Sequence, residues 1–278
     1  MGRKIPVTCI IHVKNEEINL PFTLQNIKDK FGQVVVVDSD STDKTQEIAL
    51  KFGCEIISRP CNRKGLVKQR NWALDTINFK YDWCFILDGD EIIEESLFKT
   101  LAEINYENNS YIGYRMRWKL IFLDKWIKYS SFYPTWSIRL FKHKLVRYEE
   151  RAVNAHPIVP DDKLGKLKEH FYNHDRRGLK FYFDRISPFS QLESKAQKKE
   201  VSMSLSEVPL SNFKTKMGQR RLLKVIFSKL PFRPFLLFIY LFILRGGIFD
   251  GPKGLIYIYL KVIQEWLTST LMKYDEEN

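Results

Sequence analysis

The chain has 278 residues, of which 44% are hydrophobic and 14% aromatic, so it can bury a sizeable core and does not belong to the disordered class. Its formal net charge of +12 favours anionic partners, such as nucleic acid, phospholipid head groups or a phosphorylated substrate, or else reflects a generally solvated basic surface. The four cysteines form no CxxC pair, so neither a zinc site nor a disulfide framework is indicated.

The first apolar runs predict a βαβ unit. Residues Ile5–Val13 are almost all apolar or β-branched, which is typical of a strand buried on both faces. Apolar residues at helical spacing follow, and a second apolar run, Val34–Val37, stops at Asp38. Because Met1–Lys4 lead straight into the first strand, we expect no secretory signal and a reducing, cytoplasmic location.

The alternation of helices and strands continues as far as a fourth strand. The capping residues of Ser39–Thr45 precede a helix, and a third strand is predicted at Glu55–Ser58. A basic loop and helix, Asn62–Ile77, then lead to a fourth strand, Trp83–Leu87. This rhythm predicts a doubly wound, mostly parallel sheet whose ligands bind at the carboxyl ends of the strands.

After about residue 110 the helix-strand alternation stops. Strand patterns at Ile112–Arg117 and Ser137–Phe141 flank an aromatic-rich stretch, Trp118–Trp136. Its aromatic density suits stacking on sugar faces or contact with lipid, although core packing is the other explanation. From about Lys180 onward the pattern is helical and basic.

The C-terminal part combines basic residues with an apolar run. Phe235–Leu244 has ten residues, about half of the ~20 needed to span a bilayer as a helix, so a transmembrane span is not expected. The basic residues before this run are Lys214, Lys216, Arg220, Arg221, Lys224, Lys229 and Arg233. This pairing indicates either an interfacial anchor on anionic lipid or a buried helix with a solvated basic face.

Acidic residues occupy the ends of two predicted strands. Asp88 and Asp90 follow the fourth strand and could converge on one divalent cation, Mn²⁺ or Mg²⁺, which would hold a diphosphate. An acidic turn is the alternative for so short a motif. Asp38 ends another buried strand and should lie on the same edge of the sheet, where mutual repulsion would raise a pKa or attract a cation.

Three motifs resemble the family 2 inverting glycosyltransferases of the GT-A fold. They are Lys14–Glu17, Val36–Thr45 and Ile86–Glu91, in matching order and spacing. Later segments resemble the WaaE/KdtX branch of lipopolysaccharide core glucosyltransferases, namely Leu120–Asp124, Tyr133–Pro134, Arg139–Phe141 and Phe249–Gly254. The resemblance implies a GT-A fold with a Rossmann-like, mostly parallel sheet and flanking helices, followed here by a C-terminal helical extension.

The resemblance also implies roles for individual residues. Asp38 would accept a hydrogen bond from the nucleotide base. The residues implied in nucleotide-sugar binding are Asn15, Glu16, Asp38, Asp40, Lys68, Arg70, Asn71 and Asp88. Asp88 would lie near the ribose and the metal, and Asp90 would be the direct metal ligand. His170 or His174 resembles the C-terminal histidine that completes the metal site in many GT-A enzymes.

The catalytic base is left open by the resemblance. Related enzymes carry a His-Glu pair at about the position of His156–Pro157, and this chain has proline in place of the glutamate. Inverting transfer needs a group that removes the proton of the acceptor hydroxyl. The candidates are Glu149, Glu150, His156 and Glu91.

We therefore expect a GT-A domain in residues 1–190, with a nucleotide and metal half at 1–100 and an acceptor half at 101–190. Residues 191–278 would form a helical, basic, membrane-associating extension. The predicted reaction is transfer from a UDP-sugar, with UDP-glucose as the best candidate, to a glycan or glycolipid in lipopolysaccharide core or other cell-surface synthesis. We expect the protein on the inner face of the cytoplasmic membrane.

Two rival functions fit the sequence less well. A nucleic-acid-binding protein would account for the charge and the aromatic residues, but no recognisable binding motif is present and the acidic strand ends would be unexplained. A nucleotidyltransferase would need a glycine-rich basic loop after the first strand, whereas Val13–Glu16 contains no glycine.

Overall fold

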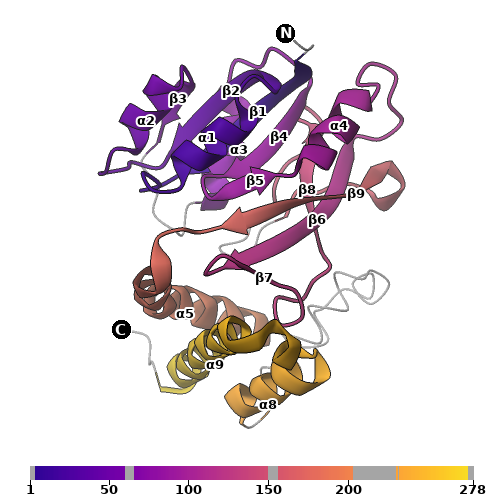
Figure 1. The fold of residues 1–278 in the computed structure, drawn as a ribbon. Helices are drawn as coiled ribbons and strands as arrows, with labels where there is room; N and C mark the ends of the chain where they lie inside the picture. Colours follow the sequence, from indigo (N-terminus) through magenta and orange to yellow (C-terminus); the bar gives the residue numbers. More distant parts are fainter. Residues whose placement is uncertain (1–3, 60–65, 150–155, 203–229, 231, 275–278) are drawn as a thin grey trace. The chain divides into compact units, whose positions relative to one another are not determined.

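The computed structural model describes residues 4–59, 66–149, 156–202, 230 and 232–274 (Figure 1). The chain divides into two compact units, Met1–Arg177 and Gly178–Asn278, which are called unit 1 and unit 2. The predicted domain boundary at residues 190 and 191 falls inside a helix of unit 2, α5 (Gly178–Ser202).

Unit 1 is built on one nine-stranded sheet in the order β3-β2-β1-β4-β8-β6-β9-β5, with β7 paired to β6 (Figure 1). The strands are β1 (Ile5–Val13), β2 (Phe31–Asp38), β3 (Glu55–Ser58), β4 (Trp83–Asp88), β5 (Glu91–Ile93), β6 (Gly113–Phe122), β7 (Lys125–Ile127), β8 (Thr135–Lys142) and β9 (Leu164–His174). The first four neighbours, β3, β2, β1 and β4, are parallel. Beyond them β8 is antiparallel to both β4 and β6, and β9 is parallel to β6.

Helices cover both faces of this sheet. The helices of unit 1 are α1 (Leu20–Ile27), α2 (Thr45–Lys51), α3 (Leu66–Thr76) and α4 (Glu95–Glu103), with a short 3-10 turn, η2 (Asp161–Lys163). One core contains buried side chains of α1, α2 and α4, and a second core on the other side contains those of α3. The prediction of an α/β fold with a mostly parallel sheet and flanking helices is confirmed.

The burial pattern explains why the apolar runs form central strands. Val35, Val36 and Val37 of β2 are all buried, and successive residues contribute to opposite cores. Cys9 and Cys84 lie within the apolar runs of β1 and β4 and are buried. The two strands expected after residue 110 are present as β6 and β8. β6 begins one residue later than predicted and continues to Phe122, whereas β8 extends beyond both of its predicted limits.

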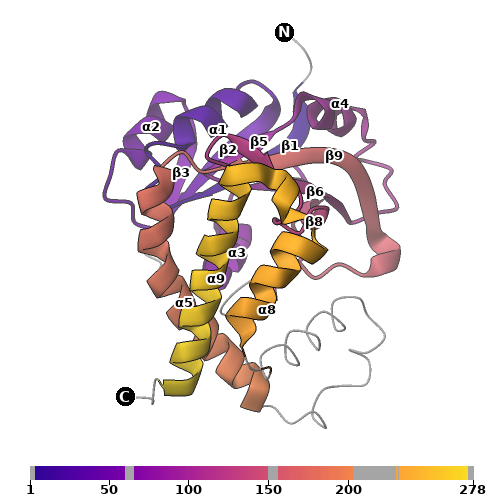
Figure 2. The same ribbon diagram turned by 60° about the horizontal axis from the view of Figure 1, so that its bottom comes forward.

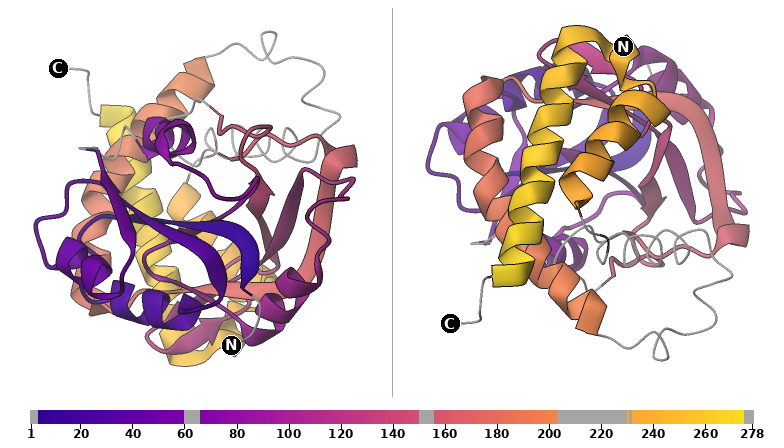
Figure 3. Two further views of the ribbon diagram at one scale, coloured as in Figure 1. Left: turned by 90° about the horizontal axis from the view of Figure 1, so that it is seen from above. Right: turned by 90° about the horizontal axis from the view of Figure 1, so that it is seen from below.

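Unit 2 is helical, as predicted. Its elements are α5, α8 (Arg233–Ile239), a π-helical turn η4 (Tyr240–Leu244), a 3-10 turn η5 (Gly247–Asp250) and α9 (Gly251–Tyr274). Helix α9 packs against both α5 and α8 (Figures 2 and 3). Arg233 is buried among these helices, with its Nη2 atom 2.5 Å from Glu265 Oε1 and 2.8 Å from Gln197 Oε1.

Within the described part of the chain, no single helix has the length and apolar composition needed to cross a bilayer. One helix pair meets these criteria jointly, Arg233–Leu244 with Gly247–Tyr274, and it is bent by 74°.

Candidate active site

Two acidic strand ends flank the carboxyl end of β1. Asp38 ends β2 and lies opposite Val13, whereas Asp88 ends β4 and lies opposite His12. One strand spacing separates each aspartate from β1, so their Cα atoms are about 10 Å apart across the sheet. The sheet therefore brings the Asp38 and Asp88 positions to one edge.

Asp38 organises the loop that follows β2. Its side chain is fully buried, and Oδ2 accepts hydrogen bonds from Ser41 N at 3.0 Å and from Gln46 Nε2 at 2.7 Å. Oδ1 accepts a bond from the Ser41 hydroxyl. The next acidic residue, Asp40, is exposed and has a φ of 67°, as expected at a tight turn.

The loops after β1 and β2 are joined by hydrogen bonds. Asn15 Oδ1 accepts a bond from Thr42 N at 2.8 Å, and Asn15 N donates to the Ser41 hydroxyl at 2.9 Å. Glu16 N donates to the Thr45 hydroxyl at 2.8 Å. These loops would position the predicted nucleotide-binding residues as one wall.

A buried cluster of polar side chains contacts the loop after β1. Arg177 pairs with Asp175 through two bonds of 2.8 and 2.7 Å and lies 3.1 Å from Glu16 Oε1. Asn19 Nδ2 donates to Glu16 at 2.9 Å and to Asp175 at 3.1 Å. Burial, followed by the charge of Asp90, raises the pKa of Glu16 to about 8, although Arg177 acts in the opposite direction.

Gly89, between the two aspartates of the motif, has no room for a side chain. A Cβ atom there would lie 2.9 Å from Glu16 Cγ and 3.1 Å from Val13 Cγ1. The Gly89 backbone is held on both sides, because its N–H donates to His12 O at 3.1 Å and its carbonyl accepts from the Thr23 hydroxyl at 2.8 Å. A glycine is therefore required for the acidic turn to approach the loop after β1 so closely.

Two arginines keep Asp88 ionised. Arg70 Nη2 lies 3.3 Å from Asp88 Oδ1, and Arg139 Nη2 lies 3.4 Å from Oδ2. Burial raises the pKa of Asp88, but Arg139 and Arg70 together lower it to about 2. Arg139 also lies 2.5 Å from Glu91 Oε1.

Asp90 is in the opposite electrostatic situation. It is buried, and burial followed by the charge of Asp88 raises its pKa to about 6. Nearby, the His12 ring is neutral, because burial and then the charge of Arg70 lower its pKa to about 3. Asp88 is thus held in its anionic form, whereas the anionic form of Asp90 is unfavourable. A cation between the two carboxylates would stabilise the anionic form of Asp90.

The two carboxylates of Asp88 and Asp90 suit Mn²⁺ or Mg²⁺ better than a metal ion whose ligands all come from the protein. Within the described residues, no three His, Cys, Asp or Glu side chains are grouped as ligands of one ion. Mg²⁺ and similar hard cations use one or two carboxylates and take their other ligands from water and from phosphate oxygens. Asp88 and Asp90 can supply the protein's share.

The two histidines predicted to complete the metal site have other partners in the structure. His170 Nε2 lies 2.8 Å from Tyr133 Oη, and its Nδ1 lies 3.4 Å from Glu94 Oε2. His174 Nε2 lies 2.8 Å from Asp124 Oδ1. The backbone N–H of His174 donates to the carbonyl of Asp90 at 2.8 Å, so β9 reaches the acidic turn through its main chain.

The predicted donor-binding residues on α3 have different environments. Arg70 faces Asp88, whereas Asn71 forms two hydrogen bonds with the backbone of Tyr148, at 2.9 and 3.1 Å. Asn71 thus connects α3 to the segment after β8. The side chain of Lys68 lies outside the described part of the structure.

The candidates for the catalytic base are spread over two places. Glu91 is buried next to Arg139, and burial raises its pKa while the guanidinium acts in the opposite direction. Glu149 N donates to His156 O at 3.1 Å, so these two residues share one local backbone pairing. Glu150 lies outside the described residues, and the base remains a prediction.

Sequence reasoning missed the arginines that organise this site. The sequence indicates Arg139 only as part of a motif, and it indicates no role for Arg177 or Asp175. Arg139 stands in a strand whose neighbours, Leu140 and Phe141, are buried, and a cation in such a position indicates a buried acidic partner. The apolar neighbours of Arg139 are visible in the sequence, but they do not tell which acidic residue is its partner.

The chain is similar to glycosyltransferases in both sequence and fold. The family described as "Glycosyl transferase family 2" has a model that matches residues 8–154. A lipopolysaccharide core biosynthesis glycosyltransferase of Rhizobium meliloti, LpsC, is 24% identical over 168 residues, which are 59% of this chain and 61% of that protein. An uncharacterized glycosyltransferase of Rickettsia bellii is 32% identical over 113 residues, 40% of this chain and 37% of its own length.

These matches reach only part of each curated relative, between 37% and 61% of its length. Among solved structures, S. aureus TarS 1-349 in complex with UDP aligns at 17% identity over 96% of this chain and 90% of that one, with a TM-score of 0.49. Glucosyl-3-phosphoglycerate synthase from Mycobacterium tuberculosis, in complex with Mn²⁺ and UDP-glucose, aligns at 14% identity over 70% of this chain and 79% of its own, with a TM-score of 0.43.

Proposed function

Because the chain belongs to glycosyl transferase family 2, and is a glycosyltransferase of the GT-A fold, we propose that it transfers a hexose from a UDP-sugar, with inversion, to a saccharide acceptor. UDP-glucose is the donor that we propose first. The observation that carries the proposal is the pairing of Asp38 and Asp88 on either side of β1, with Asp90 one short turn further on.

We propose that Asp88 and Asp90 hold Mn²⁺ or Mg²⁺ together with the donor diphosphate. The metal would neutralise the negative charge of the departing nucleoside diphosphate. The raised pKa of Asp90 next to the ionised Asp88 supports this assignment, because packing alone gives no reason to bury the two carboxylates together. His170 and His174 stay candidates for a further ligand.

The nucleoside would bind against the joined loops after β1 and β2. Asn15, Glu16 and Asp40 lie in or beside these loops, and we propose Asp38 as the group that reads the base imide. Arg70 would contact the diphosphate, since it already lies 3.3 Å from Asp88. Lys68 and Asn71 remain part of the proposed donor site.

The acceptor base is proposed from the segment that follows β8. Glu149, Glu150 and His156 belong to this segment. Glu91 is the remaining candidate, although its contact with Arg139 suits a role in holding the site together. Similarity to LpsC supports an acceptor in lipopolysaccharide core or another cell-surface glycan.

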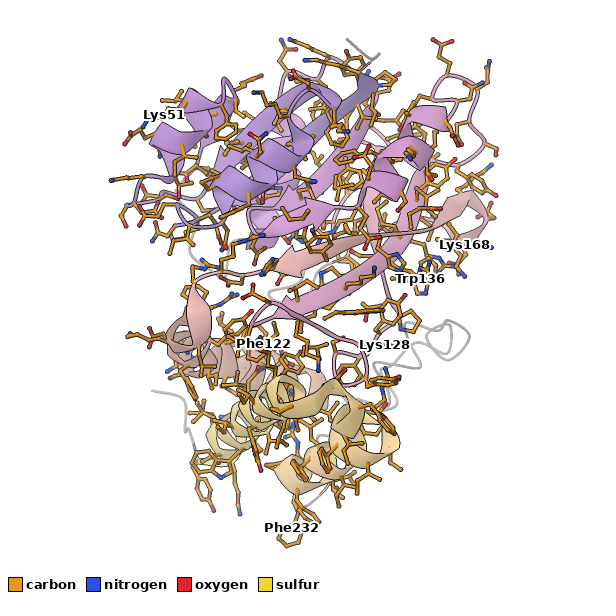
Figure 4. The ribbon with its side chains drawn as sticks, viewed as in Figure 1. Lys51, Phe122, Lys128, Trp136, Lys168 and Phe232 are labelled. Atoms are coloured by element: carbon orange, nitrogen blue, oxygen red, sulfur yellow. The ribbon has the colours of Figure 1, made fainter. Side chains whose placement is uncertain are left out.

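We further propose that unit 2 rests on an anionic lipid surface, at the inner face of the cytoplasmic membrane. Large apolar side chains are exposed along it, including Phe232, Phe235, Ile243, Leu244, Ile248, Phe249, Tyr259 and Trp266. Phe232 is 80% exposed and projects from unit 2 (Figure 4). A groove of about 710 Å³ opens between Phe232, Phe235 and Trp266.

The charges near these apolar residues favour lipid with a negative charge. Between Arg233 and Tyr274 the acidic residues are Asp250, which is 2% exposed, and Glu265, which pairs with buried Arg233. Lys253 and Lys273, by contrast, are exposed. Exposed apolar side chains with a cationic border are typical of interfacial membrane contact.

Hydrolysis of a nucleotide-sugar panel in Mn²⁺ or Mg²⁺ tests the proposed reaction. We expect release of UDP from one UDP-hexose. Asp90→Asn should lower this rate about 100-fold, equivalent to about 3 kcal/mol of lost stabilisation. Asp82→Asn, which changes an exposed aspartate paired with Lys144, is the matched control and should retain activity. Equal rates for Asp90→Asn and the wild type would refute the metal assignment. Release of UMP and sugar 1-phosphate instead of UDP would indicate cleavage at the α-phosphorus, which is the bond that a nucleotidyltransferase acts on.

Sedimentation with liposomes tests the lipid contact. Replacing Phe232 and Phe249 by Ser should reduce binding to vesicles that contain anionic phospholipid. Phe183→Ser, at another exposed phenylalanine of unit 2, should not. Equal loss in all variants, or equal binding to neutral vesicles, would contradict the proposal.

A further inference from the structure

Two arginines of β6 lack a charged partner among the residues that the structure describes. Arg115 and Arg117 each have a buried Nε atom without a hydrogen-bond partner, and neither guanidinium forms an ion pair with an acidic group among the described residues. Every other partly buried arginine of the active-site region described above, Arg70, Arg139 and Arg177, contacts a carboxylate. A half-buried, unpaired cation is unfavourable unless a ligand completes it.

The two arginines project from the same face of the sheet. Tyr114 and Met116, which alternate with them, are buried in the first core, so Arg115 and Arg117 point to the opposite face. In the register, Arg115 lies opposite Lys166 of β9, and Arg117 lies opposite Trp136 of β8. Side chains directly opposite each other in a sheet share a face.

This patch, defined as Arg115, Arg117, Trp136 and Lys166, has an excess of positive charge. Lys166 Nζ lies 4.3 Å from the centre of the Trp136 ring, and Figure 4 labels Trp136 together with Lys168, another lysine of β9. Glu94, which pairs with the neighbouring His170 of β9, is also engaged by Lys119 at 2.5 Å.

The patch lies level with the proposed metal site. Phe85 of β4 and Tyr114 of β6 are both opposite Leu140 of β8. Asp88 and Arg117 are each three residues further along strands that run in the same direction, so they are on the same face. The register of β6 and β8 shifts by one residue after Tyr114, so their heights agree to within about one residue. With β8 between them, they are two strand spacings apart, about 10 Å.

We propose that Arg115, Arg117 and Lys166 bind an oxyanion carried by the acceptor saccharide, a phosphate or a carboxylate, with Trp136 as a platform for the sugar ring. The proposal rests on the glycosyltransferase function proposed above and specifies its acceptor. Guanidinium groups bind such oxyanions through paired hydrogen bonds, and an indole face suits a sugar ring. The spacing from Asp88 places the patch beyond the diphosphate, where the acceptor must approach.

Binding measurements with matched sugars test the proposal directly. In the presence of Mn²⁺ and saturating UDP, which occupies the donor site, we would compare the dissociation constants of galactose, galactose 6-phosphate and galacturonic acid by calorimetry. At least one charged sugar should bind ten-fold or more tightly than galactose, because a hydrogen bond to a charged group contributes about 1.5–3 kcal/mol. The phosphate and carboxylate sugars separate the two possible sources of the oxyanion.

Variants then locate the charged group. Arg117→Gln and Lys166→Gln should each weaken binding of the charged sugar about ten-fold and leave that of galactose and of UDP unchanged. Lys51→Gln, which removes an exposed charge on α2, is the control. If Arg117→Gln does not fold, the proposal is still tested by the Lys166→Gln variant and by the comparison of charged and neutral sugars with the wild type.

Three results would overturn the inference. They are equal binding of charged and neutral sugars by the wild type, equal weakening of both sugars in the variants, and a rise in the dissociation constant of UDP, which would assign the arginines to the donor. Failure of the function itself has a different signature, because the wild type would then hydrolyse no nucleotide sugar.

Discussion

The Asp90→Asn variant should be more stable than the wild type when no metal is present, although its activity should be about 100-fold lower. Burial and the charge of Asp88 raise the pKa of Asp90 from 3.8 to about 6. The native state therefore holds the proton of this group more tightly than the unfolded chain does. As the pH rises from about 4 to about 6, the wild type loses stability, and above that range the loss is complete.

The size of this effect follows from the two pKa values. The difference between 3.8 and about 6 corresponds to about 3 kcal/mol at pH 8, and to about half of that at pH 5. Replacing Asp90 by asparagine keeps nearly the same shape and removes the charge, so the variant does not lose stability as the pH rises. We expect Asp90→Asn to unfold at a higher urea concentration than the wild type, with a gain that shrinks as the pH falls.

The assay is urea unfolding in EDTA at pH 5 and pH 8, followed by tryptophan fluorescence. In a second series with Mn²⁺ the difference at pH 8 should nearly disappear, because a ligand at 100 times its dissociation constant stabilises the native wild type by about 2.7 kcal/mol. Asp90→Asn should gain little from Mn²⁺. A variant that is less stable than the wild type in EDTA at pH 8, or whose gain is the same at both pH values, would refute the electrostatic reasoning.

The remaining predictions concern contacts that support the acidic turn. Gly89→Ala should lower the free energy of unfolding by about 1–3 kcal/mol, since its Cβ atom would lie 2.9 Å from Glu16 Cγ, and urea unfolding measures it; an unchanged midpoint would contradict the close approach. Arg139→Met should lower stability by about 3–5 kcal/mol by leaving Glu91 buried without its cation, and Glu91→Gln in the same chain should restore part of this loss. Lys144→Gln, at an exposed ion pair, should change stability by less than about 1 kcal/mol, and a larger effect would question the scale of the Arg139 result.

The strand ends could be predicted because their signals are local. The apolar run before Asp38 and the run before Asp88 each specify a buried strand, and parallel neighbours place both ends at one edge. The helical character of α5, α8 and α9 was likewise readable from composition. None of these inferences needed to know which distant residues meet.

The ion pairs could not be predicted in the same way, because their partners are far apart in the sequence. Arg139 reaches Asp88 across 51 residues, and Arg177 reaches the backbone of Asn15 across 162. Their meeting depends on β8 running antiparallel beside β4 and on β9 ending near the acidic turn. The periodicity of apolar residues along the chain indicates neither of these arrangements.

Arg177 also determines where this protein could be divided. The family match ends at residue 154, yet β9 lies beyond it and terminates only a few residues before the guanidinium that neutralises Glu16 and Asp175. A truncation designed on the match alone would remove one interior strand of the sheet and leave Glu16 without its cation, so a minimal enzyme must extend through Arg177. Arg177, the last residue of unit 1, thus supports the loop that we propose for nucleotide binding.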